Sequence, residues 1–366
     1  MYAYGDAANV TNERFRIGII SGKLGDVDGV SLEVDKWIGI LAAQGHEVFT
    51  ISGTYGSQPT ALPTEHQLVC EEIQFGSPEQ IYYEKLVFPH LHRHSPHISE
   101  ERKKEITDGL EIEGNEVANT LLEMVQEKDI DVIVAQNTNA MPMTLLGGIG
   151  IYKLAAERRV ATIFHHHDFW WERSRFSNNH IESLLSKIMP PADPGMEHVV
   201  LSSYAAHILR SIKRVQPRVI PNCEDFEHPV GIDDYNGAFR SELGFSDSDL
   251  LIVQPTRIVR RKRIEDSVEF VARLMEAHPE AAERVHLIIS LYQGDEPDEN
   301  YIQEILEFAR ERHVEIHLIS DRVSAVRGTD DRGRMLFTNR DVLANADLVT
   351  YLPVWEGFGN AFLEAV

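Results

Sequence analysis

Residues 351–366 read Y-L-P-V-W-E-G-F-G-N-A-F-L-E-A-V, and the rest of the chain is interpreted from this stretch. The apolar segment over residues 347–352 predicts a buried strand, the glycines after Glu356 predict a tight turn, and a helix is expected to follow. Glu364 is eight positions beyond Glu356, so the second carboxylate lies about two helical turns past the first. A helix that begins at a glycine turn directs N–H groups and a positive dipole end toward a bound anion. The same spacing also fits an ordinary strand, turn and helix with two solvated glutamates.

The length and composition of the chain predict a globular protein of two domains. Its 366 residues exceed what one hydrophobic core usually serves, and 43% apolar and 25% charged residues are ordinary for a soluble protein. Apolar runs are too short for a membrane span, and the N-terminus does not have the pattern of a secretory signal. The two cysteines, Cys70 and Cys223, fit a reducing compartment, so we expect a cytoplasmic protein.

The charge distribution favours a local anion over a nucleic acid. A net charge of −23 disfavours nucleic acids and anionic membranes as partners. Against this background, residues 256–263 (T-R-I-V-R-R-K-R) gather five cations directly after a strand expected at 250–255. Such a cluster at a strand end favours phosphate as its ligand. The alternative is a solvated basic face or a nucleic-acid patch.

The pattern of elements predicts doubly wound parallel sheets in both halves. The chain opens with a strand at 15–21, a glycine loop, a helix at 31–44 and a strand at 46–52. Further elements of the first half are strand-like pieces at 67–75 and 85–88, helices at 99–128 and 142–158, and strands at 129–135 and 160–164. The second half alternates strands at 250–255, 285–292 and 314–319 with helices at 264–278 and 302–312. Ligands of such sheets bind beyond the carboxyl ends of the strands.

Two histidine-rich stretches raise the question of a metal. His90, His92 and His94 alternate in a proline-flanked segment, and H-H-H-D at 165–168 follows a strand. Metal ligation, and with it a metal-dependent hydrolase, is one interpretation. Neighbouring histidines in an extended chain face opposite sides, however, and no cysteine or carboxylate accompanies the first group at ligand spacing. We therefore predict a solvated loop at the first stretch and no metal site at either stretch.

The stretch E-G-F-G-N-A-F-L-E resembles the E-x7-E signature of retaining glycosyltransferases of the GT-B fold. Arg257 and Lys262 resemble the R-x4-K pair of the same family, and the likeness extends over nearly all of the chain. The resemblance implies two Rossmann-like doubly wound parallel-sheet domains facing a cleft. Residues 1–222 would form the acceptor-side domain and residues 223–366 the nucleotide-sugar domain. The family continues past its second glutamate, so we expect the second domain to be truncated at Val366.

The resemblance also implies roles for individual residues. The catalytic roles fall on Arg257, Lys262, Glu356 and His167. Contacts to the donor fall on Gly29, Val30, Gly357, Phe358, Gly359, Asn360 and Glu364. Contacts to the acceptor fall on Asp28, Asn137, Asp168 and Arg173.

The implied activity is a retaining transfer of a hexose, mannose or glucose, from a nucleotide diphospho-sugar to a small hydroxylated acceptor. No cofactor is implied, because the cations and the helix terminus would stabilise the leaving diphosphate in place of a metal. Two stretches of the first domain, residues 26–37 and 165–176, also resemble enzymes that build mannosylated glucosylglycerate-type solutes from GDP-mannose. A non-catalytic sugar-nucleotide-binding regulatory protein stays open beside the metal-dependent hydrolase. The sequence does not specify the oligomeric state.

Overall fold

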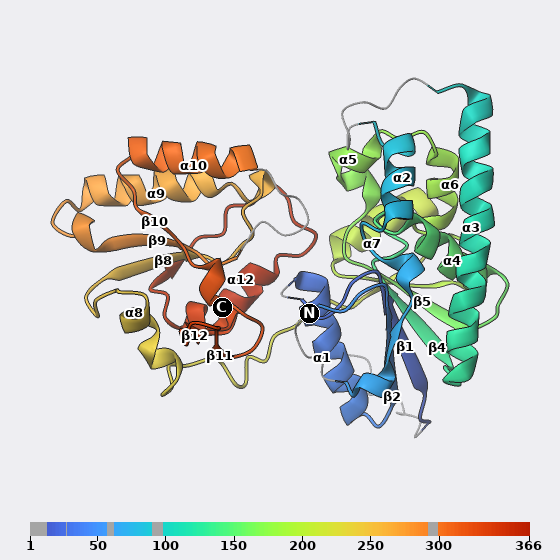
Figure 1. Cartoon of the computed structure of the whole chain (residues 1–366), viewed down its shortest axis with the longest axis horizontal. Coiled ribbons are helices and arrows are strands. Elements are labelled where there is room, and N and C mark those ends of the chain that lie inside the picture. The colour runs from blue at the N-terminus through green and yellow to red at the C-terminus, as the bar shows by residue number, and fades with distance from the viewer. Residues whose placement is uncertain (1–12, 27, 57–61, 90–97, 292–298) are drawn as a thin grey trace. The chain divides into compact units, whose positions relative to one another are not determined.

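The computed structural model describes residues 13–26, 28–56, 62–89, 98–291 and 299–366 (Figure 1). The chain divides into two compact units, Met1–Pro221 and Asn222–Val366, each with its own parallel sheet and its own core. No helix in the described part of the chain is both long and apolar enough to cross a membrane.

The first unit is built on a sheet of seven parallel strands in the order β3-β2-β1-β4-β5-β6-β7. The strands are β1 Arg16–Ser21, β2 Glu47–Ser52, β3 Gln67–Val69, β4 Val132–Gln136, β5 Ala161–His166, β6 Glu197–Val200 and β7 Arg218–Val219. Because β1 is bonded to β2 on one side and to β4 on the other, the chain winds outward from β1 in both directions. The carboxyl ends of β1 and β4 therefore flank the switch point at which doubly wound sheets bind ligands.

Helices cover both faces of this sheet (Figure 1). On one face, Val34 and Ile38 of α1 pack against Ile19 of β1. On the other face, α3 and α4 pack against Ile20, which points away from Ile19 because side chains alternate along a strand. The helices are α1 Gly29–Ala43, α2 Pro78–Val87, α3 Glu100–Glu127, α4 Leu145–Ala156, α5 Ser174–Ser177, α6 Glu182–Ile188 and α7 Ser203–Lys213.

The second unit has a smaller parallel sheet in the order β10-β9-β8-β13. Its strands are β8 Leu250–Gln254, β9 Val285–Ile289, β10 Ile316–Leu318 and β13 Leu348–Val349, and β11 Gly328–Thr329 pairs with β12 Met335–Leu336 in a separate antiparallel ribbon. Its helices are α8 Phe239–Glu242, α9 Ile264–Ala277, α10 Glu299–Glu311, α11 Asn339–Ala344 and α12 Asn360–Ala365. Since β8 lies between β9 and β13, the switch point of this sheet falls at the carboxyl ends of β8 and β13.

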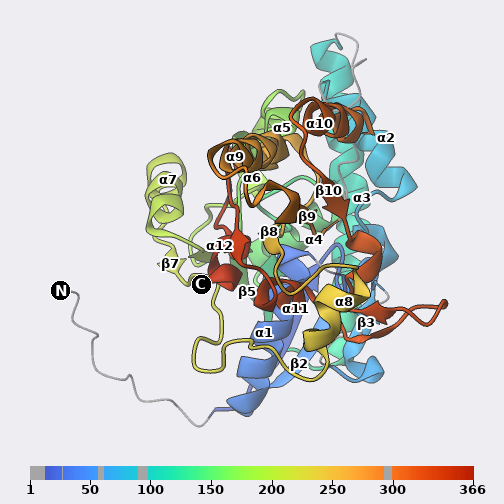
Figure 2. The ribbon, with the colours of Figure 1, turned by 90° about the vertical axis from the view of Figure 1, so that its left-hand side faces the viewer.

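The second unit also buries both faces of its sheet. Helices α9 and α10, which lie side by side in Figure 2, cover Leu287 and Ile289 of β9 with apolar side chains such as Val268 and Ile305. On the opposite face, Ile288 packs in a second cluster around Phe337. This alternation along β9 explains why the strand is apolar at successive positions.

The long helix expected at 99–128 is confirmed as α3, with Ser99 accepting a hydrogen bond from the Arg102 backbone N–H at 3.2 Å as its N-cap. The strand expected at 85–88 is wrong, because this segment ends helix α2. That helix begins at Pro78 after Ser77, whose hydroxyl accepts from the Gln80 N–H, and these start signals outweigh the short apolar run at its end.

Candidate functional site

The loop after β8 brings the basic run to the carboxyl edge of the second sheet. Gln254, the last residue of β8, is fully buried and donates from Nε2 to the Lys262 carbonyl oxygen at 2.9 Å and to Thr256 Oγ1 at 3.1 Å. These bonds tie the two ends of the loop together. The loop that carries Arg257 and Lys262 is thereby held next to the switch point.

Glu356, which follows β13, meets two cations of this loop. Lys262 Nζ donates to Glu356 Oε1, and Arg261 donates to Glu356 Oε2 at 3.0 Å. Burial lowers the pKa of Lys262, the ion pair with Glu356 acts in the opposite direction, and the nearby cations Arg261 and Arg257 lower the pKa further. The site thus concentrates positive charge around one carboxylate in a partly buried place.

Arg261 is not part of the R-x4-K pair that the sequence resemblance singles out, but the structure places it at the same site. Its guanidinium lies against Glu356, whereas Arg260 turns away to Glu304 and Arg263 turns to Asp266. The 3-10 turn Arg260–Lys262 decides which cations face inward. The run of cations was visible in the sequence, but the direction of each side chain was not.

The turn after Glu356 passes close to Tyr351. Gly359 has φ +110°, and a Cβ on this residue would lie 2.7 Å from the Tyr351 hydroxyl. The Tyr351 hydroxyl is buried and has no hydrogen-bond partner in the described part of the chain, and burial raises its pKa. Lys262 Nζ lies 6.0 Å from the centre of the Tyr351 ring. Tyr351 therefore forms an apolar support under the glycine turn and beside the cation.

Glu364 is held by a short chain of polar side chains. Asn339 Nδ2, at the start of α11, donates to Glu364 Oε2 at 3.0 Å, and Ser290 Oγ donates to Asn339 Oδ1 at 3.0 Å. Ser290 follows β9, so this chain also lies at the carboxyl edge of the sheet. Asn360 accepts from Asn222 Nδ2 at 2.7 Å. The sequence interpretation missed Ser290, Asn339 and Asn222, because hydroxyl and amide side chains after strands are too common to single out.

The first unit gathers its predicted residues at the carboxyl ends of β4 and β5. Asn137 Nδ2 donates to Asp168 Oδ1 at 2.9 Å, and Arg173 Nε donates to Asp168 Oδ2 at 3.0 Å. Burial would raise the pKa of Asp168, but Arg173 and Asn137 together lower it below its ordinary value. Asn137 has φ +58°, a conformation that is uncommon for residues other than glycine. The three predicted acceptor residues thus form one ionised, hydrogen-bonded group.

His167 is attached to the same group. Its backbone N–H donates to Asn137 Oδ1 at 3.0 Å, and its Nε2 lies 3.0 Å from Gln136 Oε1. Burial lowers the pKa of His167 to about 4, although Asp168 acts in the opposite direction. The imidazole is therefore neutral near pH 7 and is suited to hydrogen bonding rather than to carrying charge.

Asp28 ends the loop before α1 and acts as the N-cap of that helix. Its Oδ1 accepts from the backbone N–H groups of Val30 at 2.9 Å and Ser31 at 3.1 Å. Gly29 and Val30 are the first two residues of α1. A donor phosphate that used the Val30 N–H would have to replace the Asp28 carboxylate, so the roles expected for these three residues stay predictions.

Of the two histidine stretches, only residues 165–167 lie in the described part of the chain. His90, His92 and His94 lie outside that part of the chain. His166 pairs with His198 at 3.0 Å and His167 pairs with Gln136, while His165 packs against Trp37. Within the described residues, none of these histidines belongs to a group of three side chains with metal-ligand spacing.

Comparisons with known proteins bear on what these two sites do. No protein-family model matches the chain. The mannosylglucosylglycerate synthase of Petrotoga mobilis is 29% identical over 96% of this chain and 80% of the relative. The mannosylglucosylglycerate synthase of Thermotoga maritima is 30% identical over 96% of this chain and 78% of the relative.

Solved structures give the fold. Anabaena HepE in complex with UDP-glucose is similar with a TM-score of 0.61 and 14% identity, over 96% of this chain and 78% of that one. WaaG, a glycosyltransferase of lipopolysaccharide biosynthesis, is similar with a TM-score of 0.58 and 14% identity, over 95% of this chain and 78% of that one. The predicted GT-B fold, with two Rossmann-like parallel-sheet domains, is confirmed.

Proposed function

The chain belongs to the family of the mannosylglucosylglycerate synthases, which are glycosyltransferases, and we propose that it transfers a mannosyl group from a nucleotide diphospho-sugar to a glucosylglycerate hydroxyl. The relatives' name describes a product in which mannose is joined to glucosylglycerate. GDP-mannose is the donor implied by the sequence resemblance. In this proposal the transfer proceeds with retention and needs no metal.

The observation that carries the proposal is the pairing of Glu356 with Lys262 and Arg261 at the switch point of the second sheet. Cations fixed in a partly buried place stabilise the charge that develops on a leaving diphosphate. Glu356 neutralises them in the absence of a donor. When a donor binds, its phosphates take over the cations, and Glu356 becomes available to accept hydrogen bonds from sugar hydroxyls. Arg257, which lies close enough to lower the pKa of Lys262, adds a further positive charge.

Glu364 is the proposed ribose ligand. A carboxylate can accept hydrogen bonds from two vicinal hydroxyls, and Asn339 restricts the orientation of Glu364 by donating to one of its oxygens. Ser290 in turn restricts Asn339. The donor half of the reaction would therefore rest on groups from β8, β9, α11 and the chain after β13.

The acceptor half of the proposal rests on the group formed by Asn137, Asp168 and Arg173. Arg173 partly compensates the charge of Asp168, and both follow β5 at the carboxyl edge of the first sheet. Neutral His167 is fixed beside them: its Nε2–H donates to Gln136 Oε1, so its Nδ1 can accept a hydrogen bond from a sugar hydroxyl.

The proposal is tested by incubating the purified chain with glucosylglycerate and GDP-mannose, with GDP-glucose and UDP-glucose in parallel, and following products by NMR. The anomeric signal of the product reports retention, and EDTA tests the need for a metal. We expect Lys262→Met and Arg257→Met to lower kcat/KM about 100-fold to 1,000-fold, the usual loss when a charge-stabilising donor is removed. Arg260→Met is the matched control, since this guanidinium belongs to the same run but pairs with Glu304 at 2.8 Å.

Two results would overturn the proposal. If the chain binds a nucleotide sugar but forms no glycoside with any of the donors, a non-catalytic binding protein is the better description. If kcat/KM falls by the same factor in the Lys262→Met and Arg260→Met variants, the diphosphate does not bind at the site described.

A further inference from the structure

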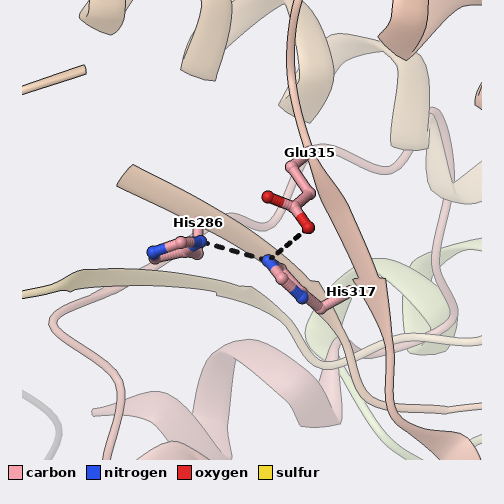
Figure 3. A group of neighbouring side chains, drawn as sticks. All are labelled: His286, Glu315 and His317. Carbon is pink, nitrogen blue, oxygen red and sulfur yellow. Dashed lines mark hydrogen bonds and ion pairs between the residues drawn. The ribbon is translucent and has the colours of Figure 1, made fainter. Parts of the chain in front are cut away.

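A group of three side chains of the kinds that bind metal ions lies in the second unit, where β9 and β10 pair. His286 is the second residue of β9, His317 is the second residue of β10, and Glu315 directly precedes β10. One ligand atom from each of the three side chains lies within 4.8 Å of the other two. Figure 3 shows the two imidazole rings approaching each other, with the Glu315 carboxylate beside His317.

The sheet register places these side chains on one face. In the parallel pairing of β9 and β10, His317 lies opposite Ile288. Because side chains alternate along a strand, His286 points to the same face as Ile288 and therefore as His317. Phe245 packs against both rings, with ring centres 5.1 Å from His286 and 4.9 Å from His317. The Phe245 ring thus restricts the movement of both imidazoles on the face of the sheet that they share.

The facing nitrogen atoms of the two imidazoles are separated by nearly the distance expected for two ligands of one metal ion. His286 Nδ1 lies 3.1 Å from His317 Nε2. Two imidazole ligands at about 2.0–2.1 Å from one tetrahedral ion are roughly 3.3 Å apart, so the rings need little movement. Asp249 Oδ2 lies 3.5 Å from the other nitrogen of His286, Nε2. A carboxylate at that position favours the tautomer with its proton on Nε2, which leaves the Nδ1 lone pair directed at His317.

Glu315 supplies the third ligand. Its Oε1 lies 3.9 Å from His317 Nε2, and its side chain is 72% exposed, so it can move toward an ion at little cost. The side chains of His286 and His317 are only 16% and 23% exposed. The cluster therefore combines two well-fixed nitrogen donors with one adjustable carboxylate, and it is open to solvent on the carboxylate side.

We propose that His286, Glu315 and His317 bind a divalent transition-metal ion of the Zn²⁺ type. The ion takes the place of the proton that the two imidazoles otherwise share, and water completes its coordination. Two imidazoles and a carboxylate favour Zn²⁺, Ni²⁺ or Cu²⁺ over Mg²⁺ and Ca²⁺, which prefer oxygen ligands alone.

The position of the site gives the ion a structural role. β10 is an edge strand of three residues that is bonded only to β9. His286 lies near the amino end of β9 and His317 in the middle of β10, whereas Lys262 and Glu356 follow the carboxyl ends of β8 and β13. An ion bound by both histidines links β10 to β9 and stabilises the edge of the sheet. It takes no part in sugar transfer.

The test is a titration of the chelator-treated chain with Zn²⁺ and, separately, with Mg²⁺, followed by calorimetry and thermal unfolding. We expect one Zn²⁺ per chain, a rise in the unfolding temperature with Zn²⁺ and no effect of Mg²⁺. His286→Gln and His317→Gln should weaken Zn²⁺ binding at least 100-fold, and Glu315→Gln about 10-fold. His278→Gln is the matched control, because this exposed histidine lies 3.4 Å from Glu280 but has no second histidine as a partner among the described residues.

The proposal is overturned if the chain takes up no Zn²⁺, or if the His286→Gln and His317→Gln variants bind Zn²⁺ as the wild type does. If a histidine variant fails to fold, the exposed Glu315→Gln variant decides the matter. With Co²⁺ bound in place of Zn²⁺, the Glu315→Gln variant should absorb visible light more weakly than the wild type. An unchanged spectrum excludes Glu315 as a ligand.

Discussion

Gly359 shows how one residue sets the geometry of the donor side. Its φ of +110° lies in a region that glycine enters without steric cost. The space where a Cβ would stand is already taken by the Tyr351 hydroxyl, 2.7 Å away. The glycine therefore permits both the turn after Glu356 and the close contact with Tyr351.

We expect Gly359→Ala to destabilise this turn by about 1–3 kcal/mol and to raise the KM for the donor. Alanine at this φ is strained, and its Cβ would displace Tyr351, which packs beside Lys262. Steady-state kinetics and urea unfolding measure the two effects. Gly328→Ala is the control in the same unit, because its φ is not positive and its Cβ would meet nothing within 4 Å. Equal KM values for the two variants would contradict the argument.

At the scale of elements, the packing of α3 against α4 depends on two glycines. A Cβ on Gly114 of α3 would lie 2.4 Å from Ile149 Cγ2, and a Cβ on Gly150 of α4 would lie 3.0 Å from Val117 Cγ1. Each helix thus places a glycine opposite a β-branched side chain of the other helix. This arrangement lets the helices approach closely over the face of the first sheet.

Gly114→Ala should destabilise the first unit by about 1–3 kcal/mol, because the stiff Ile149 side chain has no space to move into. Gly39→Ala in α1 should act in the opposite direction. Gly39 is exposed in the interior of a helix, and an alanine methyl group at this position would meet nothing within 4 Å. Alanine there should stabilise the protein by about 0.5–1 kcal/mol. Chemical unfolding of both variants measures the change in the free energy of unfolding and its sign. A loss of stability in both variants would contradict this account.

At the scale of the molecule, buried neutral histidines make the stability of the first unit depend on pH. His166 and His198 lie on neighbouring strands, with Nε2 of His166 3.0 Å from Nδ1 of His198. Burial lowers the pKa of His166 well below its ordinary value, and burial lowers the pKa of His198 to about 4. In the unfolded chain both would titrate near a pH of about 6.5.

The sign of the effect follows from proton binding. Above a pH of about 6.5 neither state binds these protons, so the histidines do not change the free energy of unfolding. Between that pH and about 4 the unfolded chain binds more protons than the folded one, so stability falls as the pH falls. At pH 5 the loss is about 2 kcal/mol for His198, since one pKa unit corresponds to about 1.4 kcal/mol.

We therefore expect the wild type to lose about 2 kcal/mol more stability than His198→Gln between pH 7 and pH 5. Urea unfolding at the two pH values measures this difference. Titration of surface carboxylates affects both proteins alike and cancels in the comparison. Equal losses in the two proteins would contradict a neutral, buried His198.

Elements with strong local signals were predictable from the sequence. The periodic apolar residues and the Ser99 cap gave α3 almost to its ends, and the β-branched run gave β1. The segment at 85–88 was misassigned because four apolar-rich residues fit a strand as well as the end of a helix. For the site, the cations after β8 and the two glutamates were visible as a pattern, whereas Ser290 and Asn339 had no pattern to reveal them.

The sequence by itself determined the order of strands and helices along the chain and the strand ends at which polar side chains gather. It also determined the family to which the chain belongs. Only the tertiary structure decided which cation meets which carboxylate. Lys262 and Glu356 are 94 residues apart and come together because β13 is hydrogen-bonded to β8 in the sheet. Local sequence sets backbone conformation over a few residues, but a contact of that separation depends on the pairing of strands and the burial of whole faces.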